Sequence, residues 1–318
     1  SLEKWPGILL IDTTTNCNAR CIWCLNPHLR TPKGVMKWAV FEKIIKDYAS
    51  RPGHVNIGTF GEPLLDPHIT KRIEYIRAFN TIDRIGLTTN AYFLDEDKAR
   101  LFIDNKVSLE ISLDELEEKK FENIKKMKFE PVIKNIKKLL SLNDRTKKSI
   151  QINFRVKTMG KADDILSNPI YRELKQHKCT VDISPVASSG ALTNWAGKFD
   201  KAGFLAANLN EKKINDHYKN YNLRNNAPCI QLWKWITVYY DGRVVLCCAD
   251  IDANKVIGDL NKQTIKEVWT GEKINSLRES FKKRRRNDIP LCRFCDLHQG
   301  WRYLKIFYNN DLKVIRLD

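Results

Sequence analysis

Hydrophobic and polar positions follow two patterns along the first two-thirds of the chain. Short apolar runs bounded by turn residues predict buried strands, and apolar positions three and four apart between them predict amphipathic helices. The strand candidates are Ile8–Thr15, His54–Phe60, Arg84–Thr89, Ser108–Leu113, Ile150–Lys157 and Thr180–Val186. The helix candidates are Lys37–Ala49, Pro67–Phe79, Asp95–Asn105, Glu130–Leu142 and Ala162–His177.

Strands that alternate with helices in this way are typical of parallel β/α units. The pattern therefore predicts an α/β fold, a partial (β/α)6 TIM-like barrel, over residues 1–215. The charge-dense segment Glu115–Lys128 is expected to form a solvated helix over the barrel mouth.

The last third changes in composition and predicts a second, smaller domain over residues 216–318. A bridge at 187–228, rich in Ser, Gly, Asn and Lys, precedes most of it. Trp233–Tyr240 and Arg243–Cys247 flank Asp241-Gly242, which predicts a β-hairpin with a type I′ turn. A helix candidate follows at Ile265–Ser280.

Composition narrows the setting of the protein. The 318 residues carry 55 Lys and Arg against 38 Asp and Glu, a net charge of +17. This balance favours anionic partners, although a solvated basic surface explains it equally well. No apolar run reaches the ~18 residues of a transmembrane helix, so we expect no membrane partner. Nine cysteines in clustered spacings, without a secretory signal, indicate metal ligands in the cytoplasm.

The most specific chemical signal is a cysteine triplet directly after the first strand candidate. Cys17, Cys21 and Cys24 have the spacing C-x3-C-x2-C. Three thiols from one loop can converge on a soft metal centre and leave one position open, whereas structural zinc sites and ordinary ferredoxin clusters close with a fourth ligand. A zinc knuckle or a coincidental spacing is the alternative.

With Trp23 before the last cysteine, this segment resembles the signature of the radical S-adenosylmethionine (SAM) superfamily. The resemblance implies a partial barrel and a [4Fe-4S] cluster on Cys17, Cys21 and Cys24, whose open iron binds SAM. It also implies an electron donor such as flavodoxin or ferredoxin. A 5′-deoxyadenosyl radical would then abstract a hydrogen atom from the substrate.

Polar residues lie at or near the C-terminal ends of the following strand candidates. In barrel enzymes the active-site residues lie at these strand ends. Gly61-Glu62-Pro63 resembles the family motif that binds the SAM amino group largely through backbone, and Asn90 ends a Thr-Thr-Asn step with Ala91 where the family has Gly. Ser112 and Asp114 resemble a Ser-x-Asp pattern that faces SAM and substrate. Arg155 is a candidate partner for the SAM carboxylate. Each residue singly is explained as well by hydrogen bonds to loop backbone.

A second constellation comprises Cys229, Cys247, Cys292 and Cys295. Four such thiols suit a zinc ribbon or a fully ligated iron–sulfur cluster. Their layout resembles the SPASM or twitch extension of radical SAM enzymes, which implies one auxiliary [4Fe-4S] cluster. Cys248 adjoins a ligand and is a candidate catalytic hydrogen donor, because related epimerases use a Cys in this region. Ordinary packing is the alternative.

Three functions remain in view. The chain resembles two-cluster dehydrogenases, which implies oxidation of a small anionic or sugar-like substrate with the auxiliary cluster as electron acceptor. The second is a radical epimerase of a sugar or peptide, and the third is a metal-binding protein without catalysis. The basic run Lys282–Arg286 is interpreted as a solvated helix end, so no nucleic-acid partner is expected.

Overall fold

The computed structural model describes residues 4–186, 192–200, 204, 229–293 and 295, and the backbone of 303–308 and 311–316. Most of the predicted bridge at 187–228 lies outside these residues. The predicted domain boundary near residue 215 also lies outside them.

Six parallel strands form the first part of the sheet, in the spatial order β6-β5-β4-β3-β2-β1. Every neighbouring pair is parallel, and β6 stands at the sheet edge, so the barrel is open. This confirms the α/β partial barrel. The strands are β1 Ile8–Ile11, β2 Gly53–Ile57, β3 Ile82–Thr89, β4 Val107–Ser112, β5 Ile152–Thr158 and β6 Thr180–Pro185.

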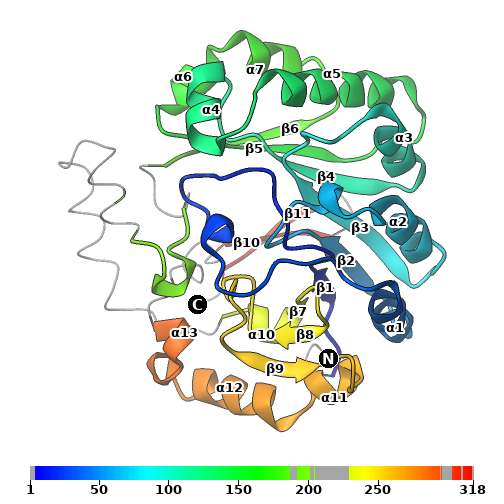
Figure 1. Cartoon of the computed structure of the whole chain (residues 1–318), viewed down its shortest axis with the longest axis vertical. Coiled ribbons are helices and arrows are strands. Elements are labelled where there is room, and N and C mark those ends of the chain that lie inside the picture. Colours follow the sequence, from blue (N-terminus) through cyan, green and yellow to red (C-terminus); the bar gives the residue numbers. More distant parts are fainter. Residues whose placement is uncertain are drawn as a thin grey trace.

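The connecting helices lie in an arc outside this sheet (Figure 1). The predicted helix Ala162–His177 is divided, because Pro169 has no amide hydrogen and keeps Asn168 extended. The helices are α1 Trp38–Tyr48, α2 Ile69–Arg77, α3 Glu96–Asp104, α4 Glu118–Lys125, α5 Glu130–Arg145, α6 Ala162–Leu166 and α7 Pro169–Leu174.

The helix α4 corrects the expectation of a merely solvated segment. Phe121, Ile124 and Lys125 are buried, and they lie three and four positions apart on one face. Glu and Lys occupy most of the remaining positions of α4. The high content of charged residues therefore gave no sign that one face of the helix is buried.

The C-terminal segment extends the same sheet. Strand β7, Trp235–Val238, lies parallel to β1, with Val238 opposite Ile11. Strands β8, Arg243–Val245, and β9, Val256–Asp259, follow antiparallel and complete a nine-stranded sheet. The strand β9 was not predicted, because Gly258 interrupts its short apolar run.

The predicted hairpin is present, but its turn is different. The amide of Tyr239 donates to the carbonyl of Arg243 at 2.8 Å, and the amide of Gly242 donates to Tyr239 at 2.9 Å. Tyr240–Gly242 therefore connect the strands, instead of the two residues of a type I′ turn. Gly242 has a φ of +90°, which glycine adopts without steric penalty.

Short helices complete the C-terminal part. The predicted helix Ile265–Ser280 is interrupted at Gly271, which is extended. The elements are the 3-10 helix η3 Trp195–Gly197, α10 Gln231–Lys234, α11 Ile265–Trp269, α12 Glu272–Lys282, the 3-10 helix η5 Arg286–Asp288, α13 Pro290–Arg293, β10 Tyr303–Tyr308 and β11 Asp311–Arg316. Strands β10 and β11 pair antiparallel with each other. Of the helices that the structure describes, none has the length and apolar character needed to cross a bilayer.

Candidate functional site

The cysteine loop after β1 is held by the end of α4. The amide of Arg20 donates to the carbonyl of Lys125, and the amide of Ile22 donates to that of Ile124, both at 3.0 Å. Carbonyls in the last turn of a helix have no partner within the helix, so they are available to the loop. The loop backbone is therefore anchored to α4.

The structure brings the three thiols of this loop together. The pKa of Cys17 is raised to about 11 and that of Cys21 to about 12, mainly by burial and in smaller part by the charges of neighbouring thiols. Burial raises the pKa of Cys24 as well. All three are therefore protonated at neutral pH in the free protein, and as ligands to a metal they would lose their protons.

The carboxylate of Glu62 joins the ends of β2 and β3. It is buried and accepts hydrogen bonds from the Thr89 hydroxyl at 2.6 Å, the Asn90 amide at 2.8 Å and the Leu64 amide at 3.1 Å. Burial raises the pKa of Glu62, and these bonds oppose the rise. Because protein groups engage this side chain, the expected binding of SAM by the Gly-Glu-Pro motif, which stays a prediction, would fall to the backbone of the motif.

Gly61 and Asn90 contact the cysteine loop directly. A Cβ at Gly61 would lie 2.3 Å from the carbonyl oxygen of Thr14, so no larger residue fits. The Asn90 side-chain amide donates to Asn18 Oδ1 at 2.9 Å. The ends of β2 and β3 therefore support the loop that carries the triplet.

Ser112 and Asp114 meet a lysine that sequence reasoning did not single out. Lys125 Nζ lies 2.7 Å from Asp114 Oδ2 and donates to Ser112 Oγ at 3.0 Å, with both charged side chains almost fully buried. The other oxygen, Asp114 Oδ1, is buried and lacks a hydrogen-bond partner among the described residues. This free acceptor fits a ligand with N–H or O–H donors, as SAM has. Lys125 lies in the charge-dense segment, where nothing distinguishes it from its neighbours.

Arg155 forms contacts through both its backbone and its side chain. Its carbonyl accepts from the amides of Leu113 and Asp114, and its guanidinium forms an ion pair with Glu110 at 3.0 Å. Lys157, two positions further along β5, has no hydrogen-bond or ion-pair partner within the part of the chain that the structure describes. Burial lowers its pKa, and Asp114 and Cys24 are among the charged groups that act on it. The sequence offered no signal for Lys157.

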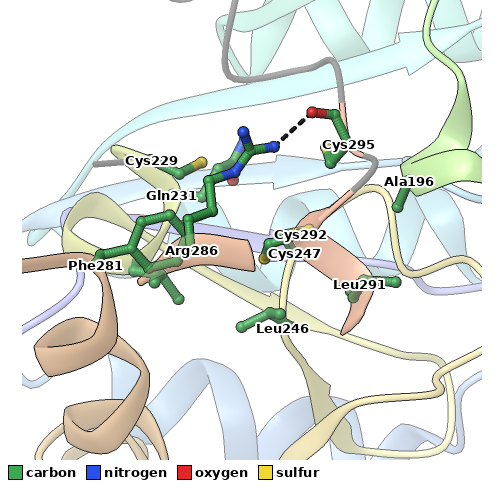
Figure 2. Close-up of a pocket in the computed structure, with 11 residues that line it drawn as sticks. Ala196, Cys229, Gln231, Leu246, Cys247, Phe281, Arg286, Leu291, Cys292 and Cys295 are labelled. Atoms are coloured by element: carbon green, nitrogen blue, oxygen red, sulfur yellow. Dashed lines mark hydrogen bonds between the residues drawn. The ribbon is translucent and has the colours of Figure 1, made fainter. Parts of the chain in front are cut away.

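The second set of cysteines surrounds a small cavity (Figure 2). Cys229 precedes α10, Cys247 follows β8, and Cys292 and Cys295 belong to α13 and its end. All four line the cavity, together with Arg286, Gln231 and apolar side chains. Arg286 Nη2 donates to the carbonyl of Cys295 at 2.5 Å. The structure thus gathers the four predicted ligands from separate elements.

Cys248 lies beside this cavity and does not line it. Its thiol accepts a hydrogen bond of 3.5 Å from Gln231 Nε2. It is therefore a fifth thiol next to the predicted ligands, with a partner of its own.

One short segment contacts both thiol sites. Trp195 Nε1 donates to the carbonyl of Trp23, inside the cysteine loop, at 3.0 Å. The next residue, Ala196, lines the cavity of the second site. The short helix η3 therefore connects the loop of the first site to the cavity of the second.

The two donor sets fit iron–sulfur clusters. Both consist of thiols, which are the ligands of such clusters. In the residues that the structure covers, no three Cys, His, Asp or Glu side chains converge closely enough for a single ion. Ligands to a cluster bind separate irons and are spaced more widely than ligands that share one ion.

A partial barrel with a three-thiol loop after β1, joined to a four-thiol site, defines a class of cluster-containing enzymes. Residues 11–165 match the family model of the Radical SAM superfamily, and residues 229–296 match the SPASM model, an iron–sulfur cluster-binding domain. The chain thus belongs to the radical SAM superfamily, in the subgroup with a SPASM or twitch extension. Its cofactors are SAM, a [4Fe-4S] cluster and an auxiliary iron–sulfur cluster.

Curated relatives match part of the chain. A stretch of 150 residues is 35% identical to the GTP 3′,8-cyclase of Clostridium botulinum (strain Okra / Type B1), covering 46% of this chain and 46% of the relative. A stretch of 212 residues is 30% identical to the GTP 3′,8-cyclase of Desulforamulus reducens, covering 64% and 63%. The chain thus spans about half to two-thirds of the length of these relatives.

Solved structures share the fold over more of the chain. BtrN in complex with AdoMet and 2-DOIA is 17% identical, with 98% of this chain and 99% of that chain covered and a TM-score of 0.61. Streptococcus suis SuiB bound to the precursor peptide SuiA is 15% identical, with 93% and 71% covered and a TM-score of 0.63. At such identities the similarity establishes the fold alone.

Proposed function

We propose that this radical SAM enzyme dehydrogenates a small anionic or sugar-like substrate and uses the auxiliary cluster as electron acceptor. The SAM-binding cluster supplies the radical chemistry that removes a C–H hydrogen atom. The substrate also gives its hydroxyl proton to a base and one electron to the auxiliary cluster, so that a carbinol becomes a carbonyl.

The connection of the two thiol sites through η3 carries this proposal. Trp195 is hydrogen-bonded to the cysteine loop, and Ala196 lines the auxiliary cavity. An electron acceptor is useful only near the site where the substrate radical forms. The four thiols of the auxiliary site also leave no open ligand position, which suits electron transfer better than substrate binding.

Lys157 supports an anionic substrate or substrate group. It stands at the end of β5, near Asp114 and Cys24, and the described residues offer its ammonium group no partner. The net charge of +17 agrees with such a ligand. The relatives named GTP 3′,8-cyclase act, by that name, on GTP, which carries phosphate groups.

The test is an anaerobic assay of the reconstituted enzyme with SAM, a reductant and a panel of sugar phosphates, aminosugars and nucleotides. Dehydrogenation predicts substrate-dependent 5′-deoxyadenosine and a product that has lost two hydrogens, with deuterium from the carbinol carbon found in the 5′-deoxyadenosine. A product isomeric with the substrate, which gains one deuterium when the assay is run in D2O, would contradict it. Lys157→Gln should weaken substrate binding, whereas Lys161→Gln, at an exposed position nearby, should not.

Epimerisation of a sugar or peptide is the second candidate, and the position of Cys248 favours it. This thiol adjoins the auxiliary ligands without lining their cavity, so it is available for a role other than ligation. If it returns a hydrogen atom to the substrate, Cys248→Ala stops turnover while 5′-deoxyadenosine still forms. Cys179→Ala is the matched control, because that thiol lies away from both sites and donates to the Leu174 carbonyl.

We also propose a cytoplasmic setting and a donor of the flavodoxin or ferredoxin type. All nine cysteines are free thiols, which a reducing compartment maintains. A low-potential one-electron donor is required for reductive cleavage of SAM.

A further inference from the structure

Arg286 is a buried cation at the auxiliary site. Arg286 is only 5% exposed, and its side chain lines the cavity with Cys229, Cys292 and Cys295. Figure 2 shows the guanidinium reaching toward Cys229 and bonded to the carbonyl of Cys295. The basic run Lys282–Arg286 is expected from the sequence to be solvated, so the burial of Arg286 at this cavity was not predicted.

The charge of Arg286 acts on the predicted ligands. The guanidinium lies in the cavity that Cys229 and Cys292 line, and it donates a hydrogen bond to the carbonyl of Cys295. A positive charge at this position would act on a cluster bound to these thiols.

The surroundings of Arg286 keep this interaction strong. Leu232, Leu246 and Phe281 line the same cavity and are each at most 5% exposed. Apolar walls exclude water, and a charge in such a site is screened less than one at the surface. The charge of Arg286 is therefore only weakly screened from the thiols that line the cavity.

We propose that Arg286 raises the reduction potential of the auxiliary cluster. When one electron enters a cluster held by four thiolates, it adds a negative charge, and a fixed cation stabilises the reduced form more than the oxidised form. Net charge, hydrogen bonding and exposure are the properties through which proteins set such potentials. This inference concerns the cluster itself and holds whether the substrate is oxidised or epimerised.

The experiment is a potentiometric titration of the auxiliary cluster, followed by electron paramagnetic resonance. It is made in the Cys17/Cys21/Cys24→Ala background, so that the SAM-binding cluster contributes no signal. Arg286→Gln, which removes the charge, is expected to shift the ratio of oxidised to reduced cluster about tenfold at a given potential. That is a fall in potential of about 59 mV for a one-electron couple. Arg286→Lys keeps the charge and should retain most of the potential.

Arg285→Gln is the matched control. The side chain of Arg285 is 66% exposed and pairs with Asp288 at 2.6 Å, so its removal should leave the potential unchanged. A Gln variant at position 286 that loads iron and titrates like this control overturns the proposal. If that variant fails to load iron, loading of Arg286→Lys decides the matter. Loading restored by Lys supports the role of the charge, and loading lost in both variants shows that the guanidinium only holds Cys295.

Discussion

The indole nitrogen of Trp195 donates a hydrogen bond to the backbone carbonyl of Trp23, across 3.0 Å and between segments far apart in the sequence. Trp23 lies between two cysteines of the first site, and Trp195 precedes a residue that lines the second. Trp195 and Ala196 both have positive φ values, of +50° and +58°. Non-glycine residues adopt this conformation only when surrounding contacts enforce it, so we interpret η3 as a segment held in place between the two sites.

Loss of the hydrogen bond from Trp195 to the Trp23 carbonyl should lower the stability of the protein. Trp195→Phe keeps an aromatic ring but removes the donor, which leaves the Trp23 carbonyl without this partner. We expect the free energy of unfolding of the cluster-free protein to fall by about 1 kcal/mol in urea titrations. An unchanged urea midpoint would show that the contact contributes nothing to the fold.

Removal of the Glu62 carboxylate should disturb both the fold and SAM binding. Glu62→Ala leaves the Thr89 hydroxyl and the Asn90 amide without their acceptor, at a cost of roughly 3 kcal/mol in unfolding free energy. Because Asn90 also contacts the cysteine loop, the Kd for SAM of the reconstituted enzyme should rise at least about tenfold. Glu117→Ala is the control, since that side chain is 53% exposed and pairs only with Lys120. Equal SAM affinity in the two variants would contradict this role.

Asp12 should make stability dependent on pH. Its carboxyl is fully buried and accepts from the amides of Thr59 and Phe60, yet burial raises its pKa from 3.8 to about 7. A raised pKa means that the folded protein binds the proton more tightly than the unfolded chain does. The contribution of Asp12 therefore favours folding below pH 4 and is lost as the pH rises toward 7.

The substitution Asp12→Asn removes this ionisation. Compared with the wild type, the variant should gain stability on the order of 4 kcal/mol above pH 8, and the gain should shrink toward pH 4. Urea unfolding of both proteins across this pH range measures the difference. A difference that does not vary with pH would mean that Asp12 keeps its ordinary pKa.

Lys126 ends α4 in the left-handed conformation, with a φ of +55°. Glycine adopts this conformation without the steric penalty of a side chain, so Lys126→Gly should raise the unfolding free energy by about 1 kcal/mol. Differential scanning calorimetry would show this as a higher Tm. Lys128→Gly, at an exposed neighbouring position without a positive φ, should give no gain. Equal effects of the two substitutions would exclude relief of strain as the cause.

Iron and sulfide analysis tests the two clusters directly. The anaerobically reconstituted wild type should hold about eight irons per chain, and Cys17/Cys21/Cys24→Ala about four, because each cluster contributes four. About four irons in the wild type that vanish in the variant, together with bound zinc, would leave the first cluster in place. That result would remove the auxiliary electron acceptor and the proposed dehydrogenation with it.

The regular alternation of strands and helices made the barrel predictable from the sequence. Each parallel strand is buried on its outer face by a helix, and this produces a periodic signal that depends on local residues. The pairing of β7 with β1 gave no such signal, because it depends on which strand edges meet in space. Breaks at Pro169 and Gly271 divided two predicted helices, although both residues are visible in the sequence.

The cysteines were recognisable because their spacing alone is informative, whereas their charged neighbours were not. Lys125 and Arg286 both lie in runs of basic residues that are typical of solvated surfaces, yet each is buried beside a thiol site. Tertiary packing determines which lysine or arginine in such a run is buried. The role of Glu62 as a connection between strand ends is likewise invisible until β2 and β3 are placed side by side.

The pairing of β1 with β7 means that the sheet cannot be completed early in synthesis of the chain. Strand β1, Ile8–Ile11, leaves the ribosome long before its neighbour Trp235–Val238. Until then one side of β1 presents unpaired amides and carbonyls, the kind of edge on which chains aggregate. Release of the nascent chain before residue 235 would therefore leave an incomplete sheet, and the barrel residues alone should be less soluble than the whole chain.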